Sequence, residues 1–215
     1  MGVVVELDTP YGRARAQLLP SEGAPVGALA LGHGAGGGVG ARDIQAAAKV
    51  ARAAGVTVAL VEQPYRVAGR RSSPPAHQLD AAWTAVISQL RAGELEGLPL
   101  VAGGRSAGAR VACRTARETG AVAVLCLAFP LQPPRRSAGA RAETRQHELD
   151  AVEVPTLVVQ GERDPFGMPR AGRARTVVAV PGDHRLTADL EAVAAAVREW
   201  LPRVLGRGSA HRAVA

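Results

Sequence analysis

Short apolar runs alternate with alanine-rich amphipathic stretches along most of this chain, and this alternation limits the possible folds more than any other feature. The runs are bounded by Gly or Pro, as buried strands are, and the stretches between them have helical spacing. The pattern predicts an α/β fold with a mostly parallel, doubly wound sheet covered on both faces. The expected strands are 27–31, 56–61, 98–102, 123–127, 156–160 and 176–180, and the expected helices are 42–54, 75–91, 107–118 and 186–204.

Three segments depart from the alternation. Residues 3–7 and 13–18, joined by Thr9-Pro10-Tyr11-Gly12, predict an antiparallel hairpin before the parallel part. Residues 132–150 are polar and too short for a large lid domain, and residues 166–175 are too broken by Gly and Pro for a crossover helix. We therefore expect one domain over residues 1–205 without a large lid, followed by a disordered tail over residues 206–215.

The net charge of +7 raises the question of nucleic-acid binding, which the composition disfavours. Only Lys49 among the 26 basic residues is a lysine, the arginines are scattered, and aromatic residues make up 3% of the chain, too few for a base-stacking surface. No apolar run approaches the roughly 18–20 residues of a membrane span, and no basic segment with an apolar stretch begins the chain. We expect a cytoplasmic protein that binds neither nucleic acid nor membrane, and we assign no function to Cys113 and Cys126.

The strongest local motif is Gly104-Arg105-Ser106-Ala107-Gly108, which lies between an apolar strand and a helical pattern. This is the context of a nucleophile elbow, a strained turn that exposes a serine while glycines on either side let neighbouring backbones pass closely. The motif predicts that Ser106 is a catalytic nucleophile.

A serine hydroxyl needs a histidine base and a carboxylate that orients the base. Asp164 follows the strand 156–160, and His184 follows the strand 176–180, so both leave the same sheet edge as Ser106. Asp183 is the rival carboxylate, but adjacent side chains point apart, so Asp164 is preferred. The predicted triad is Ser106, Asp164 and His184.

The glycine-rich loop that begins at His33 supports two interpretations. Its free backbone N–H groups can stabilise an oxyanion, and we predict that Ala35 and Ala107 supply them, with Gly36 as a neighbouring alternative and His33 shaping the loop. Gly32-x-Gly34-x-x-Gly37 also matches a dinucleotide-binding fingerprint. That alternative leaves the three triad residues unexplained.

Taken together, the segments around His33-Gly34, Gln63-Pro64-Tyr65-Arg66, Gly104-Arg105-Ser106, Gln160 to Gly167 and His184 resemble a compact α/β-hydrolase family related to dienelactone hydrolases. That family includes uncharacterised bacterial proteins and eukaryotic relatives similar to subunits of the NSL chromatin-acetylating complex. The resemblance spans about residues 25–205 and implies an α/β-hydrolase fold, the triad above and an oxyanion hole at the His33 loop. Dienelactone hydrolases carry a cysteine nucleophile, so Ser106 departs from them and their substrate does not transfer.

The sequence thus predicts a serine hydrolase that forms a covalent acyl-enzyme from a small ester or thioester and needs no cofactor or metal. We expect His33, Tyr65, Arg66, Arg70 and Arg105 at the substrate, where the arginines would bind an anionic group. The structural alternative is that these arginines tie loops to backbone carbonyls. The alternative function is an interaction protein that keeps the fold without catalysis.

Overall fold

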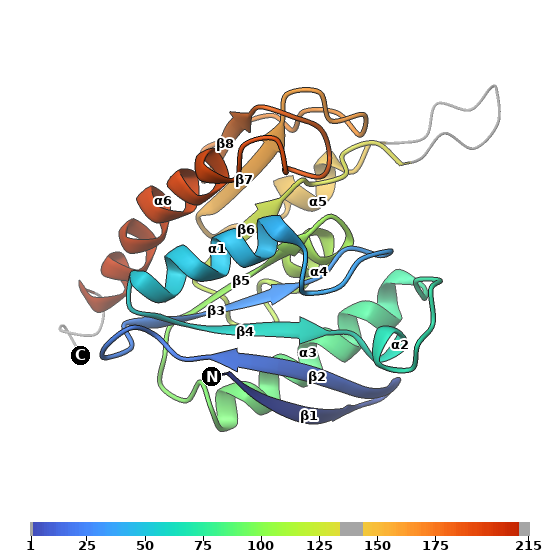
Figure 1. Cartoon of the computed structure of the whole chain (residues 1–215), viewed down its shortest axis with the longest axis vertical. Helices are drawn as coiled ribbons and strands as arrows, with labels where there is room; N and C mark the ends of the chain where they lie inside the picture. Colours follow the sequence, from blue (N-terminus) through green and yellow to red (C-terminus); the bar gives the residue numbers. More distant parts are fainter. Residues whose placement is uncertain (1, 134–143, 211–215) are drawn as a thin grey trace.

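An eight-stranded sheet forms the centre of the computed structural model, which describes residues 2–133 and 144–210 (Figure 1). The strand order is β1-β2-β4-β3-β5-β6-β7-β8; β1 and β2 are antiparallel, β2 runs antiparallel to β4, and all other neighbours are parallel. The expected mostly parallel sheet with an N-terminal hairpin is therefore confirmed. The strands are β1 (Val3–Thr9), β2 (Gly12–Leu19), β3 (Gly27–Gly32), β4 (Val56–Glu62), β5 (Leu100–Arg105), β6 (Ala123–Leu127), β7 (Thr156–Gly161) and β8 (Arg175–Val180).

Helices cover both faces of the sheet because its central strands are apolar on both sides, as buried parallel strands are. One core layer contains residues of α1 and α6, and the other contains residues of α3, α4 and α5 (Figure 1). The helices are α1 (Arg42–Ala53), α2 (Pro64–Val67), α3 (Ala76–Ala92), α4 (Ala107–Thr115), α5 (Gln146–Asp150) and α6 (Leu190–Ala210). The one-turn helices α2 and α5 are not expected from the sequence, since neither is long enough to show a helical period.

Several element boundaries differ from the sequence-based expectations, and two of these differences have a local reason. β5 continues through both glycines to Arg105, because Arg105 still pairs with Leu127 of β6. The last helix begins at Leu190 instead of residue 186, because the Asp189 carboxylate accepts a hydrogen bond from the Ala192 N–H and caps it. Helix α6 extends to Ala210 instead of residue 204, and residues 211–215 of the expected disordered tail lie outside the described part.

The strand order fixes where a site can form. The chain moves from β3 outward to β4, then returns to place β5 on the other side of β3. In open parallel sheets, ligands bind outside the carboxyl ends of the strands at such a switch point. The loops that begin at His33 and Ser106 leave β3 and β5 here.

A network of partly buried ion pairs joins α3, α4 and α5. Glu148 of α5 accepts hydrogen bonds from Arg110 and Arg114 of α4, and Arg114 also pairs with Asp80 of α3. Burial alone would raise the pKa of Glu148, but the two guanidinium groups outweigh it and hold the pKa below its ordinary value of 4.5. The ion pairs of Glu148 therefore stabilise the helix that follows Ser106 only while Glu148 is ionised.

The change Glu148→Gln is expected to lower the free energy of unfolding by about 2 kcal/mol at pH 7. Because the folded pKa is depressed, this contribution is complete above pH 4.5 and is lost as the pH falls through the folded value. Urea unfolding at pH 7 and at pH 3.5 should show the difference between variant and wild type shrinking. Glu191→Gln, in an exposed pair with Arg198, is the control and should cost under about 0.5 kcal/mol. Equal stability of Glu148→Gln and wild type at pH 7 would contradict the assignment.

Candidate active site

Ser106 occupies a strained turn between β5 and α4. Its φ is 53° and its ψ is −110°, a backbone conformation that non-glycine residues rarely adopt. The turn is held by the Ser106 N–H, which donates to the Leu127 carbonyl at 2.9 Å, and by the start of α4 at Ala107. The side chain is thereby presented above the carboxyl edge of the sheet.

Glycine is required on both sides of this turn because three backbones meet there. A Cβ placed on Gly104 would lie 2.6 Å from the Gly108 carbonyl carbon, and one on Gly108 would lie 2.6 Å from the Gly32 carbonyl oxygen. Neither obstacle is a side chain that can move away. The predicted reason for the glycines of the motif is thus visible in the structure.

The three predicted triad side chains form one continuous chain of hydrogen bonds. His184 Nε2 lies 2.9 Å from Ser106 Oγ, and His184 Nδ1 lies 2.8 Å from Asp164 Oδ2. Since a carboxylate only accepts, Nδ1 carries the proton and Nε2 is left to accept from the serine hydroxyl. The Asp183 carboxylate instead accepts from the Arg185 N–H at 2.9 Å, and the carboxylate that contacts His184 is that of Asp164.

Two residues outside the predicted site, Gln160 and Phe166, hold Asp164 and His184 in place. Gln160 is fully buried, and its side-chain amide donates to Asp164 Oδ2 at 2.8 Å while its carbonyl oxygen accepts from the Phe129 N–H. The Phe166 N–H donates to Asp164 Oδ1 at 2.8 Å, and the Phe166 ring packs edge-on against His184 with centroids 4.6 Å apart. A glutamine directly after three apolar residues, near the end of β7, was the available signal for Gln160.

The oxyanion donors predicted at Ala35 and Ala107 have suitable surroundings. Neither backbone N–H donates to an acceptor within the described residues, whereas the Ser106 N–H is already committed. Ala107 begins α4, so its N–H lies at the positive end of the helix dipole. The Tyr65 hydroxyl donates to the Ala35 carbonyl at 2.9 Å and so holds the loop in which Ala35 lies.

His33 and Arg105 have structural contacts in place of the substrate contacts expected from the sequence. His33 Nδ1 donates to the Gly34 carbonyl at 2.8 Å and Nε2 accepts from the Gln63 N–H at 3.1 Å, so both ring nitrogens are used within the protein. Burial lowers the pKa of His33, which favours this neutral form. It shapes the oxyanion loop.

Arg105 ties three parts of the site together. It forms a buried ion pair with Asp43 at 2.9 Å and donates to the His184 carbonyl at 3.0 Å, and its guanidinium lies against Gly34. Burial raises the pKa of Asp43 above 3.8, and the Arg105 charge opposes that rise. The loop-tying alternative therefore describes Arg105, whose charge is neutralised within the protein.

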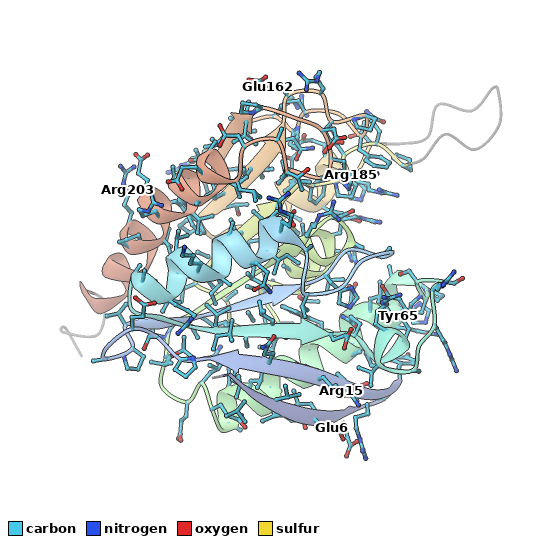
Figure 2. All side chains as sticks on the ribbon, in the orientation of Figure 1. Glu6, Arg15, Tyr65, Glu162, Arg185 and Arg203 are labelled. Carbon is cyan, nitrogen blue, oxygen red and sulfur yellow. The ribbon has the colours of Figure 1, made fainter. Side chains whose placement is uncertain are left out.

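The other residues expected at the substrate lie on α2 or just after it, at the same sheet edge: Tyr65, Arg66 and Arg70. Figure 2 shows Tyr65 at this place. It also shows Arg185, the neighbour of His184, in the loop that follows β8. Arg66 is close enough to His33 for its charge to help lower the pKa of that imidazole. Arg70 borders a separate cavity that no triad residue lines.

The described residues show neither a metal site nor a membrane span. Across residues 2–133 and 144–210, no three His, Cys, Asp or Glu side chains gather as metal ligands. No helix in the same ranges is both long enough and apolar enough to cross a bilayer. The dinucleotide interpretation also loses support, because α1 begins at Arg42 and not directly after Gly37.

A serine, a histidine and an aspartate linked in this way at the switch point of an α/β sheet have the arrangement of the triad in the α/β-hydrolase class. Within that class, the chain belongs to the alpha/beta hydrolase domain family, whose model matches residues 25–189. No curated protein sequence matches it.

Solved structures with the same fold include hydrolases and esterases. A serine hydrolase without a lid from Xanthomonas campestris has a TM-score of 0.73 and 21% identity over 94% of both chains. Est1E from Butyrivibrio proteoclasticus has a TM-score of 0.77 and 16% identity over 96% of this chain and 100% of its own. The dienelactone hydrolase of Anabaena variabilis has a TM-score of 0.73 and 18% identity over 94% of this chain and 97% of its own. The expected fold without a large lid agrees with the Xanthomonas campestris structure, which is described as having none.

The contact at Gly108 gives a direct test of the turn. Gly108→Ala is expected to lower the free energy of unfolding by about 1–3 kcal/mol, because its Cβ meets the Gly32 backbone. Gly206→Ala is the matched control in helix α6, where a Cβ meets no described atom within 4 Å, and should stabilise the protein by up to about 1 kcal/mol. Chemical denaturation of both variants provides the comparison. A neutral Gly108→Ala would show that the backbones are not packed as described.

Proposed function

We propose that this protein is a serine hydrolase that cleaves esters or thioesters of small substrates through a covalent acyl-enzyme. The observation that supports this most is the Ser106–His184–Asp164 chain, with contacts of 2.9 and 2.8 Å, on a strained turn. Strain of this kind is retained where a side chain must be held for a function. The partial exposure of Ser106 and His184 leaves the hydroxyl accessible to a substrate from solvent.

In the proposed mechanism, His184 Nε2 removes the proton of Ser106 as Oγ attacks the carbonyl carbon. The N–H groups of Ala35 and Ala107 stabilise the oxyanion of the tetrahedral intermediate. The leaving group departs with the proton from His184, and an acyl-Ser106 ester remains. A water molecule then gives a proton to His184 and attacks this ester, which releases the acid and restores the hydroxyl. Asp164 holds the imidazole tautomer and stabilises its protonated form.

A fluorophosphonate probe with mass mapping tests the mechanism, since it reacts only with an activated serine. Ser106 should be labelled, and Ser106→Ala and His184→Ala should abolish labelling. Asp164→Asn should slow it by about 10³–10⁴-fold, because the wrong imidazole tautomer is favoured. Asp183→Asn is the neighbouring control and should label like wild type, since in the described residues its carboxylate accepts a hydrogen bond only from the Arg185 N–H.

The scaffold alternative predicts a different result from the same experiment. A protein that unfolds cooperatively like a native domain yet remains unlabelled would favour an interaction protein that keeps the fold without catalysis.

The position of Arg66 favours substrates that carry an anionic group. In the described residues its guanidinium pairs with no carboxylate; it donates to the Arg70 carbonyl at 3.4 Å. A cation beside the oxyanion loop attracts carboxylate or phosphate groups. A compact fold without a large lid further favours small, water-soluble substrates over long lipids.

Arg66→Ala is therefore expected to raise KM about tenfold for 4-nitrophenyl succinate and to change KM little for the neutral 4-nitrophenyl butyrate. Steady-state kinetics on both esters, with kcat measured separately, provide the test. An equal effect on the two esters would remove Arg66 from substrate selection and leave it a structural residue.

A further inference from the structure

The edge strand β8 leaves backbone hydrogen-bonding groups without partners. It is the last strand of the sheet, and its neighbour is β7 (Figure 1). The carbonyls of Ala174 and Val180 accept hydrogen bonds on the β7 side. Successive residues of a strand direct their backbone groups to alternate edges, so Arg175, Val177 and Ala179 direct theirs to the open edge.

Only two of these residues are available for a further strand. Arg175 exchanges backbone hydrogen bonds of 3.0 and 3.2 Å with Gly172 in the turn before the strand. Pro181, directly after the strand, has no N–H. Within the described residues, the N–H and C=O groups of Val177 and Ala179 make no hydrogen bond.

The edge at β8 also lacks the features that usually prevent strands from pairing with other molecules. Residues 176–180 contain no charged residue and no proline. At the opposite edge of the sheet, β1 carries the carboxylates of Glu6 and Asp8, and the Asp8 carbonyl accepts from the Gln89 side chain of α3 at 2.8 Å. Two copies of β1 would bring like charges together, whereas two copies of β8 would not.

An apolar hollow of about 390 Å³ lies between β8 and α6, on the face of the sheet that α6 covers. It shows that α6 does not cover the outermost strand completely. The partly buried ring of Trp200 forms one of its walls. The complete lining is Leu157, Thr176, Val178, Ala179, Val180, Ala192, Ala195, Ala196, Glu199, Trp200 and Arg203.

We propose that β8 pairs antiparallel with β8 of a second copy of this chain about a two-fold axis, which joins two sheets into one. With Val178 on the axis, Val177 of each copy lies opposite Ala179 of the other, and all four unpaired groups of each copy form hydrogen bonds. A shift by one residue pair in either direction places one of these residues opposite Arg175, which is already bonded, or Pro181, which has no N–H.

The charges of α6 are complementary in the same arrangement. Asp189 caps the start of α6, and Arg203, labelled in Figure 2, lines the hollow near its end. The two residues are fourteen positions apart in the sequence, which is about four helical turns, so both lie on the same face of the helix. The two-fold axis makes the two α6 helices antiparallel and brings Arg203 of one copy towards Asp189 of the other.

Sedimentation equilibrium of the full chain tests the proposal independently of any hydrolase activity. Wild type should be a dimer with a Kd in the micromolar range, and a monomer at a concentration of about 500 μM would overturn the proposal. Ala179→Pro should weaken dimerisation about 30-fold, because each copy loses an N–H donor that makes no bond in the monomer. Ala179→Val keeps the N–H and should dimerise like wild type. Equal dimerisation of the two variants would also contradict the proposed pairing.

Two exposed arginines of α6 provide a matched test of the charges. Arg203 and Arg198 each pair with a glutamate of the same helix, but only Arg203 lines the hollow. Arg203→Glu should weaken dimerisation about tenfold, because it places like charges opposite each other, and Arg198→Glu should leave dimerisation unchanged. Equal effects of the two changes would show that α6 does not face the second copy in this way.

Cross-linking tests the register. In Val178→Cys the two introduced thiols face each other across the axis, so glutathione disulfide should oxidise them to an intermolecular disulfide and be reduced to glutathione. Thr176→Cys is the control, since its two copies would be about 13 Å apart along the strands and should not be linked. A dimer in which Val178→Cys is not linked, or in which both variants are linked equally, would show that the copies meet at another surface.

Discussion

Close backbone contact between β3, β5 and α4 is the constraint on which the rest of the site depends. The distances around Gly32, Gly104 and Gly108 leave no space for a side chain, so α4 can begin almost on top of the sheet. A helix that starts so close to the strand end forces the connecting residue into a left-handed backbone, and Ser106 is that residue. The strain, the exposed hydroxyl and the position of Ala107 at the helix start follow from one packing contact.

Around this turn, buried polar side chains hold the loops in place, because loops lack the regular backbone hydrogen bonds of helices and strands. Gln160 connects the Asp164 loop to the end of β6, and Arg105 connects the Ser106 turn to the His184 loop and to Asp43 of α1. Each donor or charge has a partner, so its burial stabilises one geometry at little net cost. Three loops that are distant in the sequence are held at fixed separations, which is what a hydrogen-bonded triad requires.

The arginines at this edge of the sheet differ in whether a carboxylate partner neutralises their charge. The sequence alone does not distinguish them. Arg105 is neutralised by Asp43, whereas Arg66 and Arg70 have no carboxylate partner in the described residues. Tyr65 lies between the oxyanion loop and the cavity at Arg70 and contacts both. The uncompensated charges of Arg66 and Arg70 therefore lie on α2 and in the residues that follow it.

The sequence by itself determined the layered α/β fold, the N-terminal hairpin and the choice of Ser106, Asp164 and His184, because these depend on local periodicity and on strand ends that must share one edge. It misplaced the start of α6, which depends on the Asp189 cap, and the end of α6, and it did not reveal α2 or α5. Only the tertiary structure decided that His33 and Arg105 are structural, that Gln160 supports Asp164, and that Gln63 lines a cavity. Those roles depend on which residues from distant segments meet in the fold. Contacts between distant segments produce no periodic pattern in the sequence, so they cannot be predicted from it.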